Sequence, residues 1–243
     1  MKLSTAFFYR FKTQLKFLSV FVGIFSLIPL IIPIINIFRN VSYNSTSSDV
    51  VLPAFFYFLG ITIFTVRIDF KFFIQNSMSR NNIFLSFFLS LISISAFLTI
   101  LLSSLKFIIS AFFSNQVKYT LSITELYAPN NPLLSALVLF SLFSLAGSIG
   151  LLIGTFYQRF NNWVHLMTFG IIIVSPSLIG LTLYHGGANF RNTIFMFFKT
   201  ILGINKDSFN PIILMGTLLV ITSIILIPSF LMNKTMEIQR VNA

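Results

Sequence analysis

The chain has 243 residues, of which 56% are hydrophobic and only 9% are charged, and its formal net charge is +11. A soluble domain of this length could not hide so much apolar surface, so a lipid bilayer is the expected solvent. The absence of cysteine excludes disulfides, thiolate nucleophiles and cysteine-based metal sites. The basic residues lie at the ends of apolar runs, where anionic headgroups attract them, so we expect membrane lipid and not nucleic acid as a partner.

Residues 1–16 are predicted to form an interfacial amphipathic helix that lies on the inner membrane surface and bends into the first span. The apolar residues of this segment recur at helical spacing, and its basic residues populate the other faces: Phe7, Phe11, Leu15 and Leu18 against Arg10, Lys12 and Lys16. A solvated basic tail is the alternative interpretation.

Six apolar runs are each long enough to cross about 30 Å of hydrocarbon as a helix. They cover about 17–38, 50–68, 83–105, 133–157, 163–184 and 211–232, and apart from Arg67, at the end of the second run, they contain no Asp, Glu, Lys or Arg. A shorter apolar stretch, 194–204, contains Lys199 and is expected to be re-entrant on the outer side before the last helix. The sequence therefore predicts a single all-α integral membrane domain with six transmembrane helices over 1–243.

Orientation follows from the basic residues of the connections. Lys and Arg are in modest excess on the side of the two termini, mainly through Lys2, Arg10, Lys12 and Lys16. Because basic loops remain in the cytoplasm, we predict a multi-pass plasma membrane protein with both termini cytoplasmic.

Two stripes of small or polar residues mark helix faces. In the fourth run, Ala146, Gly150 and Gly154 are spaced four apart, which predicts close packing against another helix. The third run carries a serine stripe that indicates either interhelical hydrogen bonds or a wall of a transport pathway, namely Ser86, Ser90 and Ser93.

The sequence offers no catalytic machinery of its own. It lacks a phosphate-binding loop, so ATP would have to be bound by another subunit. His165 and His185 are 20 residues apart, or about 30 Å along a helix, which is too far to share a metal. Ion-coupled transport is disfavoured because the runs carry no ionisable side chain near their middle, where a proton or cation relay would need one. We therefore expect a non-enzyme without a cofactor in this chain.

The connection between the second and third runs, 67–82, is the most distinctive polar stretch. Charges and amides alternate there with apolar residues, which favours a short helix with one apolar face. Such an element suits docking to a soluble partner, and a solvated loop is the alternative.

Within this connection, Gln75-Asn76-Ser77-Met78-Ser79-Arg80 resembles a Gln-Asn-Gly-x-Ser-Arg-like stretch. That stretch follows the second span in small type-2 ATP-binding cassette exporter permeases of Gram-positive bacteria, and Ser77 replaces its usual glycine. The segment 150–160 is similar to the end of the fourth span in the same family. The plan of six spans with a long outer connection before the last is also shared over the whole chain.

The resemblance implies that an ATPase subunit carrying ATP and Mg²⁺ docks on the cytoplasmic face, and that 69–82 forms the coupling helix lying in its groove. It further implies a second permease copy, identical or paralogous. The residues implied in coupling are Asp69, Lys71, Phe72, Phe73, Gln75, Asn76, Met78 and Arg80.

The expected cargo is an amphipathic or hydrophobic peptide, such as a toxin or bacteriocin, because the walls are uncharged and rich in Phe and Ser. Two alternatives stay open: an exporter of lipid or drug, and a non-transporting membrane immunity or sensor protein.

Overall fold

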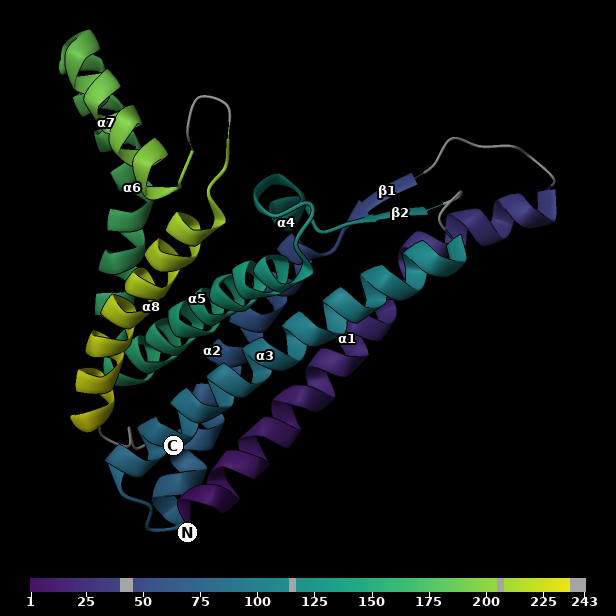
Figure 1. Ribbon diagram of the computed structural model, residues 1–243. Coiled ribbons are helices and arrows are strands. Elements are labelled where there is room, and N and C mark those ends of the chain that lie inside the picture. Colours follow the sequence, from purple (N-terminus) through teal and green to yellow (C-terminus); the bar gives the residue numbers. More distant parts are fainter. Residues whose placement is uncertain (40–45, 114–116, 205–207, 237–243) are drawn as a thin grey trace.

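The computed structural model describes residues 1–39, 46–113, 117–204 and 208–236. Its long helices form an elongated bundle, and the N-terminus, the α2–α3 turn and the C-terminal end of α8 lie together at one end, called here the terminal end (Figure 1). The elements are α1 (Leu3–Arg39), β1 (Thr46–Asp49), α2 (Val51–Gln75), α3 (Arg80–Phe113), β2 (Val117–Thr120), α4 (Ser122–Tyr127), α5 (Pro132–Arg159), α6 (Asn162–His185), α7 (Gly187–Ile201) and α8 (Pro211–Lys234).

The architecture is that of a helical membrane protein. Within the described residues, five helices are long and apolar enough to cross a membrane: α2, α3, α5, α6 and α8. The predicted span 17–38 falls on α1, a helix of 37 residues that runs from the terminal end to the opposite end of the bundle (Figure 1). The side chains of 26–39 lie outside the described part, so a count of six spans stays a prediction.

The segment 1–16, predicted to be a separate interfacial helix, is the first half of the longer helix α1, and its position at the membrane surface stays a prediction. The structure has one uninterrupted helix, α1, with no break between this segment and the following run. Ala6, Arg10 and Gln14 are buried against the bundle, so one face of this half of α1 packs in the core. The physical reason is that the polar side chains of this face find buried partners on α2 and α3.

The core lies between α1, α2, α3 and α5. Phe58 of α2, Leu98 of α3 and Phe143 of α5 are fully buried in it and pack with Leu18 and Phe21 of α1. A second apolar cluster lies at the terminal end, around Phe70, Phe73, Met78, Ile83 and Phe87. The two clusters together make four of the long helices one packed unit.

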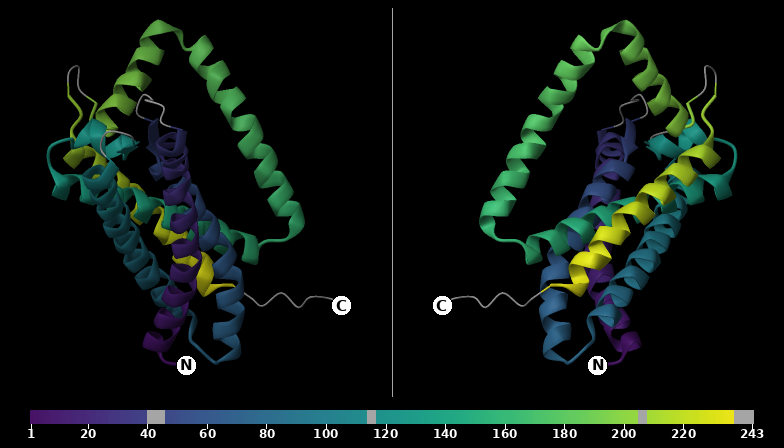
Figure 2. Two further views of the ribbon diagram at one scale, coloured as in Figure 1. Left: turned by 90° about the vertical axis from the view of Figure 1, so that its right-hand side faces the viewer. Right: turned by 90° about the vertical axis from the view of Figure 1, so that its left-hand side faces the viewer.

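The α6–α7 hairpin stands apart from this unit. Figure 2 shows α6 and α7 as two arms that meet at an apex, with α6 separated from the other helices along most of its length. Neither helix has a buried residue. The chain reverses at Gly186 and Gly187, where Gly187 has φ +73°, a backbone conformation that favours glycine. Helix α7 therefore begins before the predicted re-entrant segment 194–204. The path of this segment in a membrane stays a prediction.

The end of the bundle opposite the terminal end contains elements that the apolar runs did not predict. β1 and β2 form a two-stranded parallel ladder, an addition to the predicted all-α class. The Asp49 carboxylate accepts hydrogen bonds from the Val51 N–H, at 3.0 Å, and from Ser122 Oγ, which joins the ladder to α2 and α4. The Tyr127 hydroxyl donates to the Leu202 carbonyl at 2.8 Å and so links α4 to the end of α7.

The small residues of α5 lie where α2 crosses it. A Cβ added at Gly150 would lie 2.7 Å from the Leu59 carbonyl oxygen, and one added at Gly154 would lie 2.9 Å from Cβ of Val66. Ala146 is buried in the same packed unit. The absence of a side chain at Gly150 and Gly154 therefore allows the backbones of α2 and α5 to approach closely.

We predict that Gly150→Ala lowers the free energy of unfolding by about 1–3 kcal/mol, because the new methyl group meets backbone that has no rotamer with which to escape. Thermal unfolding of the purified chain in detergent measures this. The matched control is Gly216→Ala in α8, where an added Cβ meets nothing within 4 Å. Equal melting temperatures for the two variants would contradict the packing described.

Candidate functional site

A buried ion pair joins α1 to α2 near the terminal end. Arg10 Nη1 of α1 lies 2.8 Å from Asp69 Oδ2 of α2, and the two side chains are only 1% and 2% exposed. A buried charge without a partner is costly in a low-dielectric interior, whereas a paired and hydrogen-bonded one is tolerated. The pair therefore fixes the register between the first half of α1 and the last two turns of α2.

Arg10 also binds α3. Its Nε donates a hydrogen bond to Ser90 Oγ at 2.9 Å, and its guanidinium lies 4.0 Å from the centre of the Phe87 ring. One turn further along α1, Gln14 Nε2 donates to Thr65 Oγ1 at 3.1 Å. Arg10 thus connects three helices.

The spacing of α1 explains why these polar groups meet α2 and α3. Ala6, Arg10, Gln14 and Leu18 are four residues apart, so they share one helix face, and all four are buried. This face could have been read from the sequence as a small–basic–amide–apolar stripe. The apolar residues Phe7, Phe11 and Leu15, which the sequence suggested as the packed face, are only partly buried.

The turn between α2 and α3 is a helix stop followed directly by a helix start. The Met78 N–H donates to the Phe73 carbonyl and the Ser77 N–H to the Ile74 carbonyl, which is the hydrogen-bond pattern of a Schellman motif. Ser77 has φ +55°, in the left-handed region where glycine is usual at this position. The Ser79 hydroxyl then accepts from the Asn82 N–H at 3.4 Å and caps α3.

Further contacts tie this turn to the N-terminus and to the end of α8. The Met1 ammonium donates to the Asn76 carbonyl at 3.2 Å. Arg80 Nη1 donates to the Lys234 carbonyl, and Asn233 Nδ2 donates to the Arg80 carbonyl, both at 2.9 Å. The turn is therefore held by α1 on one side and by α8 on the other.

The structure corrects the local form expected for 67–82. No separate helix lies there, because α2 continues to Gln75 and α3 begins at Arg80. The predicted coupling residues divide into two sets. Three are buried and point into the bundle: Asp69, Phe73 and Met78. Five are exposed, and we call them the turn surface: Lys71, Phe72, Gln75, Asn76 and Arg80.

The serine stripe of α3 is used inside the chain. Ser90 accepts from Arg10, as described, and donates to the Phe87 carbonyl at 2.9 Å. Ser86 is also buried and donates to the Ile83 carbonyl of its own helix. Ser93 is partly buried. In the single chain, the structure therefore places Ser86 and Ser90 at a helix interface and not on an open wall.

Fold and site together define a helical membrane protein whose terminal end is braced by a buried ion pair and presents a compact polar turn. No family model matches the chain, and neither a curated protein nor a solved structure matches it. What the protein does is therefore argued from its residues.

We predict that Arg10→Met lowers the free energy of unfolding by about 3–5 kcal/mol, because it leaves the Asp69 carboxylate buried without its partner. The double variant Arg10→Met with Asp69→Leu should recover most of this loss, since both charges are then gone. Chemical unfolding of four proteins in mixed micelles, namely the parent, Arg10→Met, Asp69→Leu and the double variant, gives the coupling energy.

The half-exposed pair Lys106–Glu125, at 3.0 Å, supplies the control. Lys106→Met should change stability by about 0–1 kcal/mol, because water screens that pair. A double variant that is no more stable than the Arg10→Met single variant would refute the role assigned to the ion pair.

Proposed function

We propose that the chain is the permease subunit of an ATP-driven exporter of the ATP-binding cassette type. The observation that carries the proposal is the turn surface: a polar turn with an exposed Phe72, built at the end of a braced set of helices where the N-terminus and the C-terminal end of α8 also lie. A rigid turn at the end of the bundle would let a soluble ATPase subunit transmit its movement to the membrane helices. The glycine expected by resemblance at Ser77 corresponds to the left-handed residue of the turn, which supports the resemblance on physical grounds.

The chain's own charges support an external energy source. Among the described residues, the fully buried charged side chains are Arg10 and Asp69, and each is neutralised by the other. Neither is free to relay a proton through the bundle. ATP and Mg²⁺ would be bound by the partner subunit, and this chain would supply the docking surface.

Coupling would pass through the helix ends that the turn connects. A displacement of the turn surface moves α2 and α3 together, and Arg10 carries the movement to α1 because it binds both helices. Arg80 carries it to α8 through the Lys234 carbonyl. The proposed stroke is a rigid-body change of these helices relative to a second copy.

The second permease copy, identical or paralogous, has an available surface on α6. This helix has no buried residue, and its apolar side chains therefore require either lipid or another protein. With α1 counted as a span, the chain crosses the membrane six times and places both termini in the cytoplasm of a Gram-positive cell. An amphipathic peptide remains the proposed cargo, because the exposed walls of the helices are apolar.

We predict that Phe72→Ala weakens binding of the ATPase subunit about tenfold, because Phe72 is the large apolar side chain of the turn surface. The full chain is co-expressed with candidate ATP-binding cassette ATPases from the same genome, and both complex formation and ATP turnover are measured in liposomes. Phe107→Ala, an equally simple truncation of an exposed Phe on α3 away from the turn, is the matched control.

Phe73→Ala separates docking from folding. Phe73 is fully buried, so its truncation should lower stability by about 3–5 kcal/mol whatever partner the turn binds. An ATPase that binds the Phe72→Ala and parent chains equally well, or no ATPase binding at all, would rule out the turn surface as the docking site.

A further inference from the structure

We infer that a groove between α1 and α2 binds an anionic phospholipid of the membrane leaflet at the terminal end. The groove has a volume of about 410 Å³, within the range of ligand-binding pockets. Its lining is almost entirely apolar: Phe17, Phe56, Tyr57, Gly60, Ile61, Phe64, Thr65 and Ile68.

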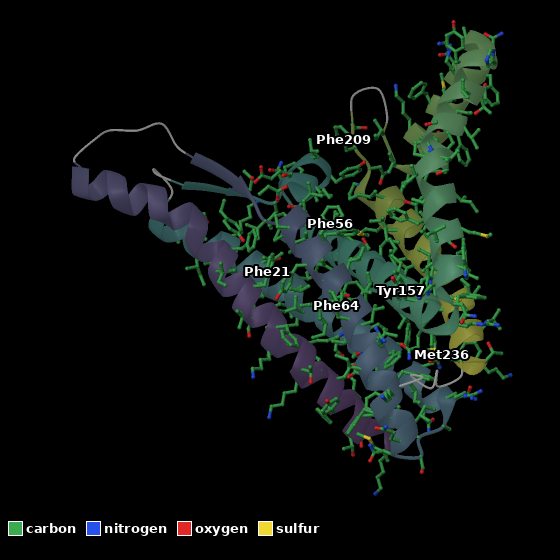
Figure 3. All side chains as sticks on the ribbon, turned by 180° about the vertical axis from the view of Figure 1, so that it is seen from behind. Phe21, Phe56, Phe64, Tyr157, Phe209 and Met236 are labelled. Atoms are coloured by element: carbon green, nitrogen blue, oxygen red, sulfur yellow. The ribbon has the colours of Figure 1, made fainter. Side chains whose placement is uncertain are left out.

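Gly60 gives the groove its depth. An added Cβ there would meet nothing within 4 Å, so the missing side chain leaves open space on the outward face of α2. One rim is held in place by Tyr57, whose hydroxyl donates to the Phe17 carbonyl at 3.2 Å and whose ring stacks on Phe21 at 3.9 Å. In Figure 3, Phe56 and Phe64 lie along α2 beside the α1 segment that carries Phe21. The groove is thus a fixed feature of two packed helices.

The dimensions fit an acyl chain. From Phe56 to Ile68 the α2 axis rises about 18 Å, close to the depth of one hydrocarbon leaflet, about 15 Å. A lipid tail lying along α2 would therefore reach from the headgroup level to about the middle of the bilayer.

Two basic residues lie on the same face at the end nearer the turn. Gly60, Phe64, Arg67 and Lys71 recur at helical spacing, and Arg67 and Lys71 are exposed. Among the described residues, neither has a hydrogen bond or an ion pair. Asp69, on the inward face of α2, is used by Arg10. An apolar groove that ends in two unpaired cations complements an anionic phospholipid: the groove fits the acyl chain and the cations fit the charged headgroup.

The positive charges on this face of α2 also disfavour a second copy of the chain as its occupant. A symmetric dimer formed through the outward face of α2 would place Arg67 and Lys71 near their own copies, and buried like charges are repulsive. An anionic headgroup neutralises the same pair. The inference does not depend on the proposed function, since a sensor or an immunity protein would carry the same groove.

The test measures lipid binding to the full chain in detergent by native mass spectrometry, with phosphatidylglycerol and phosphatidylcholine as the probes. Arg67→Gln with Lys71→Gln should weaken phosphatidylglycerol binding about thirtyfold, the effect of two charge–headgroup contacts, and leave phosphatidylcholine unchanged. Gly60→Leu, which fills the groove, should reduce binding of both lipids. The charge-conserving Arg67→Lys with Lys71→Arg should bind as the parent does.

The matched control removes the same charge elsewhere. Lys12→Gln with Lys16→Gln changes two exposed basic residues of α1 that do not line the groove, and phosphatidylglycerol binding should fall less than threefold. Equal losses in the two double variants would reduce the effect to general surface charge and overturn the site. Because the chain has no cysteine, Phe64→Cys gives a clean second measurement. A disulfide between two copies in native membranes would show that a second chain occupies this face and would also overturn the inference.

Discussion

The buried pair between Arg10 and Asp69 is the interaction on which the terminal end depends. An isolated charge at this depth would be costly, so either residue alone would drive α1 away from the bundle or draw water into it. Paired at 2.8 Å and supported by Ser90 and Phe87, the two charges instead hold three helices in one register. The consequence is that the first half of α1 is a structural strut, and the α2–α3 turn is built on a rigid base.

The α2–α3 turn is held in a fixed position by this base. The residues that most resemble an exporter motif are those that end one helix and begin the next, with Ser77 in the left-handed conformation and Met78 packed inward. The motif is therefore first a structural device, and the side chains that remain exposed around it are few. Phe72 is the one large apolar group among them, so the proposed docking of a soluble partner rests mainly on this side chain.

The sequence predicted the long helices well, because an apolar run is visible in the local sequence and a helix of such residues is stable in lipid. It predicted the site less completely. The pairing of Arg10 with Asp69 joins residues 59 positions apart, and nothing local reveals it, although the four-residue spacing of Ala6, Arg10 and Gln14 marked the buried face. The alternation of polar and apolar residues over 67–82 likewise did not predict that α2 continues to Gln75. The contacts that bury Asp69 and Phe73 come from other helices, so they are not visible in the local sequence.

The most direct measurement concerns the place of α1. The Tyr9 and Phe72 rings are stacked with their centres 5.0 Å apart, whereas Phe8 lies on the other side of α1 and is 64% exposed. In native membranes, a chain with cysteines at Tyr9 and Phe72 should be cross-linked within the chain by a short bifunctional thiol reagent much faster than a chain with cysteines at Phe8 and Phe72. If the first pair fails to cross-link, or if both pairs react alike, the N-terminal half of α1 lies elsewhere and the braced terminal end does not exist.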